Sequence, residues 1–156
     1  MHSTLTELAP TDLTASPRVQ RFVTFFEALT PNDIAQLDQL YQPDARFVDP
    51  FNDVTGLPAI ADIFRHMFVT LQGPRFVVTS QMEQGRQCFL TWEFRFRFKR
   101  FRRDTQQTIH GATHLEFGAT GLVMLHRDYW DAAQELYEKL PLLGVLMRWL
   151  RRQAMR

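Results

Sequence analysis

A short segment near the end of the chain, His-Arg-Asp-Tyr-Trp-Asp at residues 126–131, brings together several groups that can do chemistry. It follows an apolar run at residues 122–125. Side chains alternate between the two faces of a strand, so His126, Asp128 and Trp130 are expected to share one face. An imidazole held by a carboxylate keeps one tautomer and can move a proton. The segment predicts either an acid–base site in a pocket or a His–Asp pair within the core, because buried charge must be paired.

Asp49 is the third candidate for acid–base chemistry, together with His126 and Asp128. It precedes Pro50 at the end of a short predicted strand. Desolvation favours the protonated form of a carboxyl group, which makes a carboxylate at the mouth of an apolar pocket a more useful base. An Asp-Pro step is equally typical of a turn that ends a strand. Two carboxylates and a histidine could also ligate a metal such as non-heme iron, but spacing alone is weak support, and we predict no metal.

A wall of aromatic side chains is predicted from the segment 89–101, where Phe94, Phe96 and Phe98 alternate with basic residues. Such a wall suits a flat apolar ligand, and its deeper rings are expected to belong to the core. The predicted ligand-binding residues are Tyr41, Phe51, Phe64, Phe68, Trp92, Phe94 and Trp130. His110 and His114 fall on the opposite face of their strand from Thr113, so we expect them to point away from the pocket.

The elements that must position these residues follow from the spacing of apolar side chains. Apolar residues at helical spacing predict a helix over 17–29, a second short helix after the break at 31–33 that ends at Pro43 and has Tyr41 on its apolar side, and a third from Pro58 to the Gly73-Pro74 step. A short strand is expected at 45–49 and a loop at 51–56. The period then changes to two, which predicts strands at 76–81, 89–101, 108–117 and 122–130, before a closing helix from Asp131 that Pro141 divides.

Clustered helices followed by clustered strands indicate an α+β fold, a cone-shaped, mostly antiparallel curved sheet wrapped around N-terminal helices. The expected organisation is a flexible arm at 1–15, one cone domain at 16–131, and an amphipathic C-terminal helical extension at 132–156. Residues 142–156 combine apolar residues with arginines, and we favour packing on the domain or on a partner over contact with an anionic membrane. Arg127 is expected on the outer sheet face, in an external salt bridge or a homodimer interface.

The chain resembles the ketosteroid isomerase and SnoaL-like branch of the nuclear transport factor 2 superfamily over residues 18–130. The resemblance is carried by Asn-Asp-Ile at 32–34, Leu-Tyr-Gln-Pro-Asp-Ala at 40–45, Val-Asp-Pro-Phe at 48–51, Gly56 with Ile60, and Tyr-Trp at 129–130. It implies the cone fold and a pocket beneath the helices. It is less specific for a reaction, because one fold hosts many functions.

The resemblance also implies roles for single positions. The general base of the isomerases corresponds to Asp49, and their catalytic tyrosine corresponds to Phe25, which cannot donate a hydrogen bond. Their second oxyanion donor, a buried carboxylic acid, falls near Thr113, and Tyr41 matches a tyrosine that supports the catalytic one. Since this pair of donors is that family's oxyanion device, a steroid isomerase is not expected. The polar residues on the last strand point to the SnoaL side of the superfamily.

Composition narrows the classes of function. The chain has 156 residues, a net charge of +1 and one cysteine, Cys88, which we expect to be a buried thiol. This charge balance argues against nucleic acid as a partner, although residues 95–103 are basic. The start lacks signal-peptide character and no apolar run is long enough to span a membrane, so a cytoplasmic location is expected. No phosphate-binding glycine loop is present, so no organic cofactor is expected.

We therefore expect a SnoaL-like protein with an aromatic-lined pocket for a small apolar ligand. The leading hypothesis is acid–base catalysis of isomerase, cyclase or hydrolase type by Asp49, His126 and Asp128. The alternative is non-catalytic binding of a hydrophobic ligand, or a module that docks a protein or a membrane.

Overall fold

A computed structural model describes residues 15–100, 103–137 and 152. The helices are α1 (Pro17–Glu27), the 3₁₀ helix η1 (Pro31–Gln39), α2 (Leu57–Thr70) and the short α3 (Ala132–Glu135). The strands are β1 (Tyr41–Val48), β2 (Asp53–Thr55), β3 (Leu71–Gln84), β4 (Gln87–Phe98), β5 (Gln107–Phe117) and β6 (Val123–Tyr129). After α2, the strands β3 to β6 follow one another without a described helix between them, as the change of spacing predicts.

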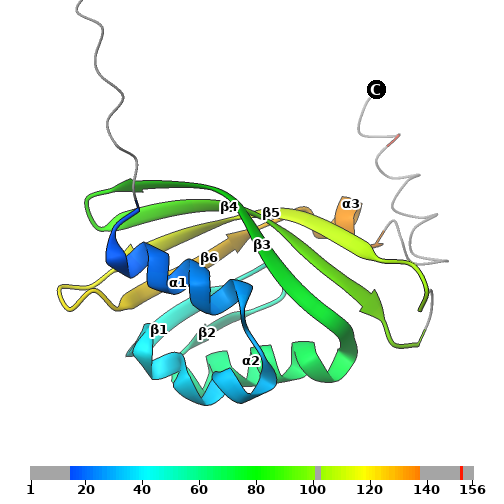
Figure 1. The fold of residues 1–156 in the computed structure, drawn as a ribbon, viewed down its shortest axis with the longest axis horizontal. Coiled ribbons are helices and arrows are strands. Elements are labelled where there is room, and N and C mark those ends of the chain that lie inside the picture. Colours follow the sequence, from blue (N-terminus) through cyan, green and yellow to red (C-terminus); the bar gives the residue numbers. More distant parts are fainter. Residues whose placement is uncertain (1–14, 101–102, 138–151, 153–156) are drawn as a thin grey trace, which may run out of the picture.

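The strands form one curved sheet in the order β2-β1-β6-β5-β4-β3. β1 and β6 run parallel, and the other neighbouring pairs are antiparallel. Helices α1 and α2 lie on the concave side of the sheet, and α2 contacts η1, β1 and β3 (Figure 1). The predicted α+β cone is therefore confirmed, with an open rather than a closed sheet.

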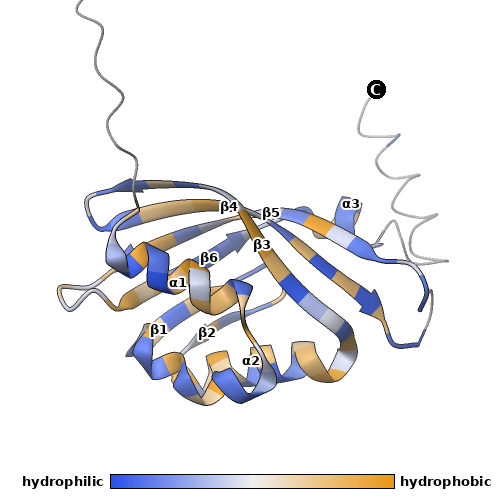
Figure 2. Ribbon diagram, viewed as in Figure 1, coloured by the Kyte–Doolittle hydropathy of each residue, from blue (hydrophilic) through white to orange (hydrophobic). Residues whose placement is uncertain are grey.

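The core lies between the helices and the concave face of the sheet. Pro17 opens α1, where its missing N–H has no helical partner to lose, and Val19, Phe22 and Phe26 form the buried face of the helix. Apolar and polar residues alternate in the second half of β4, from Glu93 to Phe98 (Figure 2), and in its first half every second side chain is buried. The period of two therefore sends one set of side chains inward, towards the helices, and the other outward.

The region around Tyr41 differs from the expectation. Tyr41 is the first residue of β1 rather than part of a helix, and Pro43 lies inside the strand instead of ending a helix. The pairing of β1 with β6 is irregular between Tyr41 and Arg46. Proline has no N–H to offer a sheet, and an irregularity is one of the places where a strand tolerates it.

Two further boundaries move for similar reasons. Helix α2 ends at Thr70, and the Gly73-Pro74 step lies within β3, where the pairing with β4 shifts between Gln72 and Arg75. β3 is the last strand of the sheet, so its proline removes no essential ladder bond. The segment expected as a loop at 51–56 contains β2, which pairs with β1.

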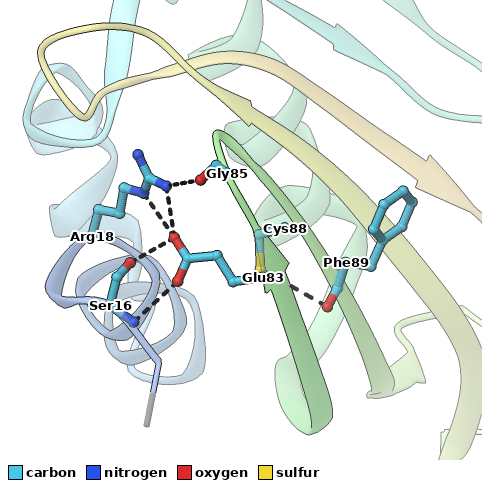
Figure 3. Close-up of polar contacts among 6 residues, drawn as sticks. All are labelled: Ser16, Arg18, Glu83, Gly85, Cys88 and Phe89. Atoms are coloured by element: carbon cyan, nitrogen blue, oxygen red, sulfur yellow. Dashed lines mark hydrogen bonds and ion pairs between the residues drawn. The ribbon is translucent and has the colours of Figure 1, made fainter. Parts of the chain in front are cut away.

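A polar cluster ties the start of α1 to the β3–β4 hairpin (Figure 3). Oε1 of Glu83 accepts hydrogen bonds from Oγ of Ser16 at 2.8 Å and Nε of Arg18 at 2.9 Å, and Oε2 accepts from the Ser16 backbone at 3.1 Å. Arg18 also donates to the carbonyl of Gly85 and lies over the ring of Phe117. The cluster fixes the helix that covers one end of the sheet.

Several predictions concern residues outside the described part of the chain. These are most of the arm at 1–15 and most of the extension at 132–156, so the domain boundaries stay predictions. Asp131 does begin a helix, because its carboxylate accepts hydrogen bonds from Ala133 N and Gln134 N at 3.0 Å each. Among the described helices, none has the length and apolar character needed to cross a membrane.

Candidate active site

The imidazole of His126 is enclosed between the helices and the sheet. The residue is 4% exposed, and both ring nitrogens have side-chain partners. Nδ1 lies 2.6 Å from the hydroxyl of Tyr41, and Nε2 lies 2.9 Å from Oδ1 of Asp128. The ring lies parallel to that of Tyr41, with 3° between the planes and 6.0 Å between the ring centres, and it meets three phenylalanines edge-on, Phe22, Phe26 and Phe47.

The burial of Tyr41 determines the direction of these hydrogen bonds. Tyr41 is fully buried, and its hydroxyl has Nδ1 of His126 as its one partner among the described residues. Its proton must go to Nδ1, since it would otherwise be buried without an acceptor. Burial, and then the nearby charge of Asp128, raise the pKa of Tyr41 well above 10.0, so the phenol keeps this proton. His126 is consequently a neutral imidazole whose Nε2–H donates to Asp128.

A second chain of hydrogen bonds reaches the same carboxylate oxygen from β4 and β5. Thr113 and Asp128 are direct cross-strand partners. Nε1 of Trp92 donates to Oγ1 of Thr113 at 2.8 Å, and Oγ1 lies 2.5 Å from Oδ1 of Asp128. An indole nitrogen can only donate, so the one hydroxyl proton of Thr113 is directed to Asp128. Oδ1 thus accepts two hydrogen bonds, from Thr113 and His126.

The other oxygen of Asp128 is available to a ligand. Among the described residues, no group donates a hydrogen bond to Oδ2, and no buried side-chain oxygen or nitrogen is left without a partner. Oδ2 is therefore not sealed in the core. The side chain is 14% exposed and borders the cavity described next. One oxygen of the carboxylate is thus held by two donors, while the other has no donor among the described residues.

A cavity of about 410 Å³ lies between α2 and the inner face of the sheet, a size within the usual range for a small-molecule site. Its walls are mostly apolar and its polar groups are few. The lining residues are Phe47, Asp49, Phe51, Ile63, Phe64, His66, Met67, Thr70, Leu71, Phe76, Trp92, Phe94, Phe96, Phe98, Ile109, Asp128, Trp130 and Leu136. A smaller void of about 30 Å³ lies deeper, and both His126 and Asp128 border it.

Asp49 lines the cavity from the end of β1 and takes part in a turn. Its Oδ1 accepts from the backbone N–H groups of Phe51 and Asn52 at 2.7 Å each, and the amide of Asn52 contacts both carboxylate oxygens at 3.0 and 3.1 Å. The turn and the pocket, which the sequence presents as alternatives, therefore coexist. Asp49 and Asp128 also share a more open hollow of about 580 Å³ beside the cavity.

Most of the predicted site residues meet at this cavity. Asp49, Asp128, Phe51, Phe64, Trp92, Phe94 and Trp130 line it. The exceptions are His126, which lies behind Asp128, Tyr41, which lies behind His126, and Phe68, which packs on the core outside the lining. The aromatic rings of Phe51 and Trp130 lie 5.4 Å apart in an edge-on contact.

Thr113 is the residue of this hydrogen-bonded group whose place the sequence does not indicate. The family resemblance places it near an oxyanion donor of the isomerases, whereas in the structure it links Trp92 to Asp128. Thr113 lies two residues before Leu115, which is also buried. The alternation of side chains along a strand therefore puts Thr113 on the inner face of β5. Phe25, the position of the isomerase tyrosine, packs against Phe26 and is not part of the cavity lining.

His110, His114 and Arg127 face outward, as the alternation predicts. His110 is exposed between Glu93 and Glu135, at 3.8 and 3.9 Å. His114 stacks on Phe89 with 4.5 Å between ring centres, and the guanidinium of Arg127 lies 5.9 Å from the ring of Tyr129. Within the described residues, no group of three His, Cys, Asp or Glu side chains is arranged to hold a metal ion.

Comparison of the fold with solved structures gives the class of protein. The chain is similar to a protein with a ketosteroid isomerase-like fold from Catenulispora acidiphila crystallised with trimethylamine (18% identity, 79% of this chain and 92% of that chain, TM-score 0.67). It is also similar to TerC co-crystallised with polyporic acid (18%, 76% and 95%, 0.65). A third neighbour is an epoxide hydrolase of the LEH-like type from M. tuberculosis (16%, 86% and 93%, 0.61).

These likenesses establish a cone fold of the ketosteroid isomerase and nuclear transport factor 2 type. The family is given by the sequence itself, because the model of the SnoaL-like domain matches residues 22–126. The chain belongs to the SnoaL-like domain family. A search of curated proteins found no significant match.

Proposed function

We propose that this protein is an acid–base enzyme that moves a proton on a small, apolar, carbonyl-bearing ligand held in the 410 Å³ cavity. The observation that carries the proposal is the hydrogen bonding of the Asp128 carboxylate. Two donors hold Oδ1, none of the described residues donates to Oδ2, and the Asp128 side chain borders the cavity. A fixed carboxylate with one free oxygen in an apolar site is the arrangement that general base catalysis requires.

Each of the surrounding residues has a separate role in the proposed reaction. Asp128 takes a proton from a carbon next to the ligand's carbonyl and returns it at the same or another carbon. His126 and Thr113 are positioning residues, because they act on the ligand only through Asp128. Asp49 supplies a second carboxylate at the mouth, and the aromatic walls bind the apolar body of the ligand.

Solved relatives agree with a small-molecule role for this fold. TerC was crystallised with polyporic acid and the Catenulispora protein with trimethylamine, while the M. tuberculosis relative is an epoxide hydrolase. These ligands and this activity belong to those proteins. For the present chain they support a ligand in the cavity, and the type of reaction is inferred from Asp128.

The test uses β-tetralone in D₂O, because this ketone is flat and apolar and has acidic hydrogens beside its carbonyl. Proton NMR measures the rate at which these hydrogens exchange with solvent. We expect the protein to accelerate exchange, and Asp128→Asn to lower the acceleration by about 100-fold or more, the scale of a lost general base. Asp62→Asn is the matched control, since Asp62 is an exposed carboxylate on α2 that pairs with Arg65.

Two results would count against the proposal: no acceleration by the wild-type protein with any cyclic ketone that binds, or full acceleration by Asp128→Asn. The first result favours the second candidate function, non-catalytic binding of a hydrophobic ligand. One observation supports that candidate. Phe25 offers no hydrogen-bond donor, and the hydroxyl proton of Thr113 is already directed to Asp128, so the two isomerase positions stabilise no oxyanion here.

We also propose a homodimer through the outer face of the sheet, where Phe89 and Tyr129 are 49% and 53% exposed. Large apolar side chains on a sheet face are typical of an interface. Size-exclusion chromatography with light scattering tests this proposal. Phe89→Ser with Tyr129→Ser is expected to give monomers, and a wild-type monomer at all concentrations would rule the dimer out.

A further inference from the structure

We propose that the ligand of the cavity carries a positive charge on nitrogen, as a hydrophobic amine in its ammonium form or as a quaternary ammonium compound. This inference rests on the proposed function, because it names the substrate class for the same site. The structural basis is an aromatic cavity that contains two carboxylates whose hydrogen-bond partners are all neutral.

The charge of Asp128 is not compensated by its neighbours. Its partners are the hydroxyl of Thr113 and Nε2–H of His126. Because the buried Tyr41 hydroxyl donates to Nδ1, the imidazole is neutral and the His126–Asp128 pair keeps one full negative charge. His126 therefore orients the carboxylate without neutralising it.

The charge of Asp49 is also uncompensated. Its partners are two backbone N–H groups and the side-chain amide of Asn52, all neutral. No lysine or arginine is among the described residues that line the cavity. Arg127 borders the outer hollow together with both aspartates, but its guanidinium lies over the ring of Tyr129, and no described ion pair joins it to either carboxylate.

The aromatic walls favour the same ligand charge. Phe51, Phe94, Trp92 and Trp130 border the cavity, and the faces of aromatic rings attract a cation, most strongly when it is desolvated. An anion placed here would meet two like charges, which costs free energy in a medium of low polarity. A neutral ligand would leave both carboxylates partly desolvated and without a counter-charge.

A cationic ligand also explains how the negative charge that develops on the carbonyl oxygen is stabilised without a hydrogen-bond donor at the two isomerase positions. Removal of a proton beside a carbonyl leaves negative charge on oxygen, and the two positions matched to the isomerase oxyanion donors supply no donor here. A cationic nitrogen within the ligand stabilises that charge electrostatically, because unlike charges attract strongly where water is excluded. The bond to hydrogen breaks, its proton passes to Oδ2 of Asp128, and the electron pair moves to the carbonyl oxygen beside the cation.

Three probes of nearly the same shape test the sign of the preferred charge: phenyltrimethylammonium, the neutral tert-butylbenzene and the anionic α,α-dimethylphenylacetate. Dissociation constants are measured by NMR titration of the full chain at low ionic strength. We expect the cation to bind about tenfold more tightly than the neutral probe, and the anion to bind most weakly. Asp49→Asn and Asp128→Asn should each weaken the cation several-fold and leave the neutral probe unchanged.

Asp62→Asn is again the control, because it removes an exposed carboxylate away from the cavity lining and should not change the order of the probes. Equal or tighter binding of tert-butylbenzene, binding of none of the probes, or cation binding that survives both cavity substitutions would overturn the inference. The exchange of β-tetralone is measured on a neutral ligand. A failed charge preference with Asp128-dependent exchange therefore refutes this inference alone, while a cation preference without any exchange refutes the proposed catalysis alone.

Discussion

The indole ring of Trp92 lies directly over Gly111, its cross-strand partner. A Cβ atom at position 111 would come within 2.3 Å of Cη2 and 2.4 Å of Cζ2 of that ring. Only a residue without a side chain allows the indole to lie flat there, and from that position Nε1 reaches Thr113 at 2.8 Å. Gly111 thus controls the orientation of Asp128 through two intermediates.

Gly111→Ala is accordingly expected to push the indole away and to break its hydrogen bond to Thr113. Forcing a methyl group into a filled site costs about 1–3 kcal/mol, which urea denaturation will measure. The indole N–H signal in a ¹⁵N-edited NMR spectrum should shift as well. Combining the substitution with Trp92→Phe should recover part of the loss, because the smaller ring does not reach over position 111. Simple additivity of the two effects would contradict the proposed contact.

Substituting Thr113 tests the link between the indole and the carboxylate. Thr113→Val keeps the shape but leaves Nε1–H of Trp92 without its acceptor, and an unpaired buried donor costs about 1–3 kcal/mol. Exchange catalysis should fall together with stability, since Asp128 loses one of its two donors. Thr113→Ser retains the hydroxyl and should restore both properties. If valine and serine behave alike, the hydroxyl has no role in positioning.

Stability at high pH reports on Tyr41. Burial raises its pKa well above 10.0, whereas the unfolded chain has a pKa near that value. The folded state therefore resists ionisation of the phenol. The stability that this provides is complete below pH 10 and is lost as the pH rises further, because the unfolded state then loses its proton first. Melting temperatures from pH 8 to 11 should fall less steeply for Tyr41→Phe than for the wild-type protein.

Acid stability reports on Glu83 at the start of α1 (Figure 3). Burial acts to raise the pKa of this carboxyl group, but hydrogen bonds from Ser16 and Arg18 outweigh it, and the pKa lies below 4.5. The resulting stability is present above the unfolded pKa and is lost as the pH falls through the folded value. Glu83→Gln should therefore destabilise the protein by about 1–3 kcal/mol at pH 7 and by much less at pH 3. Equal losses at both pH values would show that charge is not involved.

The thiol of Cys88 offers a probe of global unfolding. The side chain is fully buried, and burial raises the pKa of the thiol to about 11. Thiolate is the reactive form, so labelling by a disulfide reagent at pH 8 should be negligible in the native state and complete in denaturant. Rapid labelling of native protein would show that β4 opens locally.

Hydrophobic periodicity predicted the elements that matter most for the site. The alternation along residues 122–130 placed His126 and Asp128 on one face, and in the structure their side chains are in contact at 2.9 Å. The alternation along β4 likewise placed Trp92 and Phe94 inside, where they line the cavity. Both results depend only on the side-chain period of a strand, which is a local property.

The pairing of residues across neighbouring strands cannot be predicted in the same way. Thr113 meets Asp128 because of the register of β5 against β6, and register is set by turn geometry and by packing over the whole sheet. At Tyr41, by contrast, the local pattern predicts the wrong element. The spacing of Tyr41 from Leu37 and Leu40 suits a helix. In the structure Tyr41 is instead the first residue of β1, because its pairing with β6 outweighs a weak local preference for helix.

The contact between Tyr41 and His126 joins residues that are 85 positions apart and depends on the single parallel pairing in the sheet, β1 with β6. Long-range pairings form late, since much chain entropy must be lost before they give any stabilisation. A chain in which β6 has not yet paired with β1 already contains most of the aromatic wall. Its Asp128, however, is not yet backed by a His126 imidazole that Tyr41 holds in place. The proposed catalytic site should therefore be complete only when β6 pairs with β1, and molecules that have not reached this stage should not catalyse the proposed exchange.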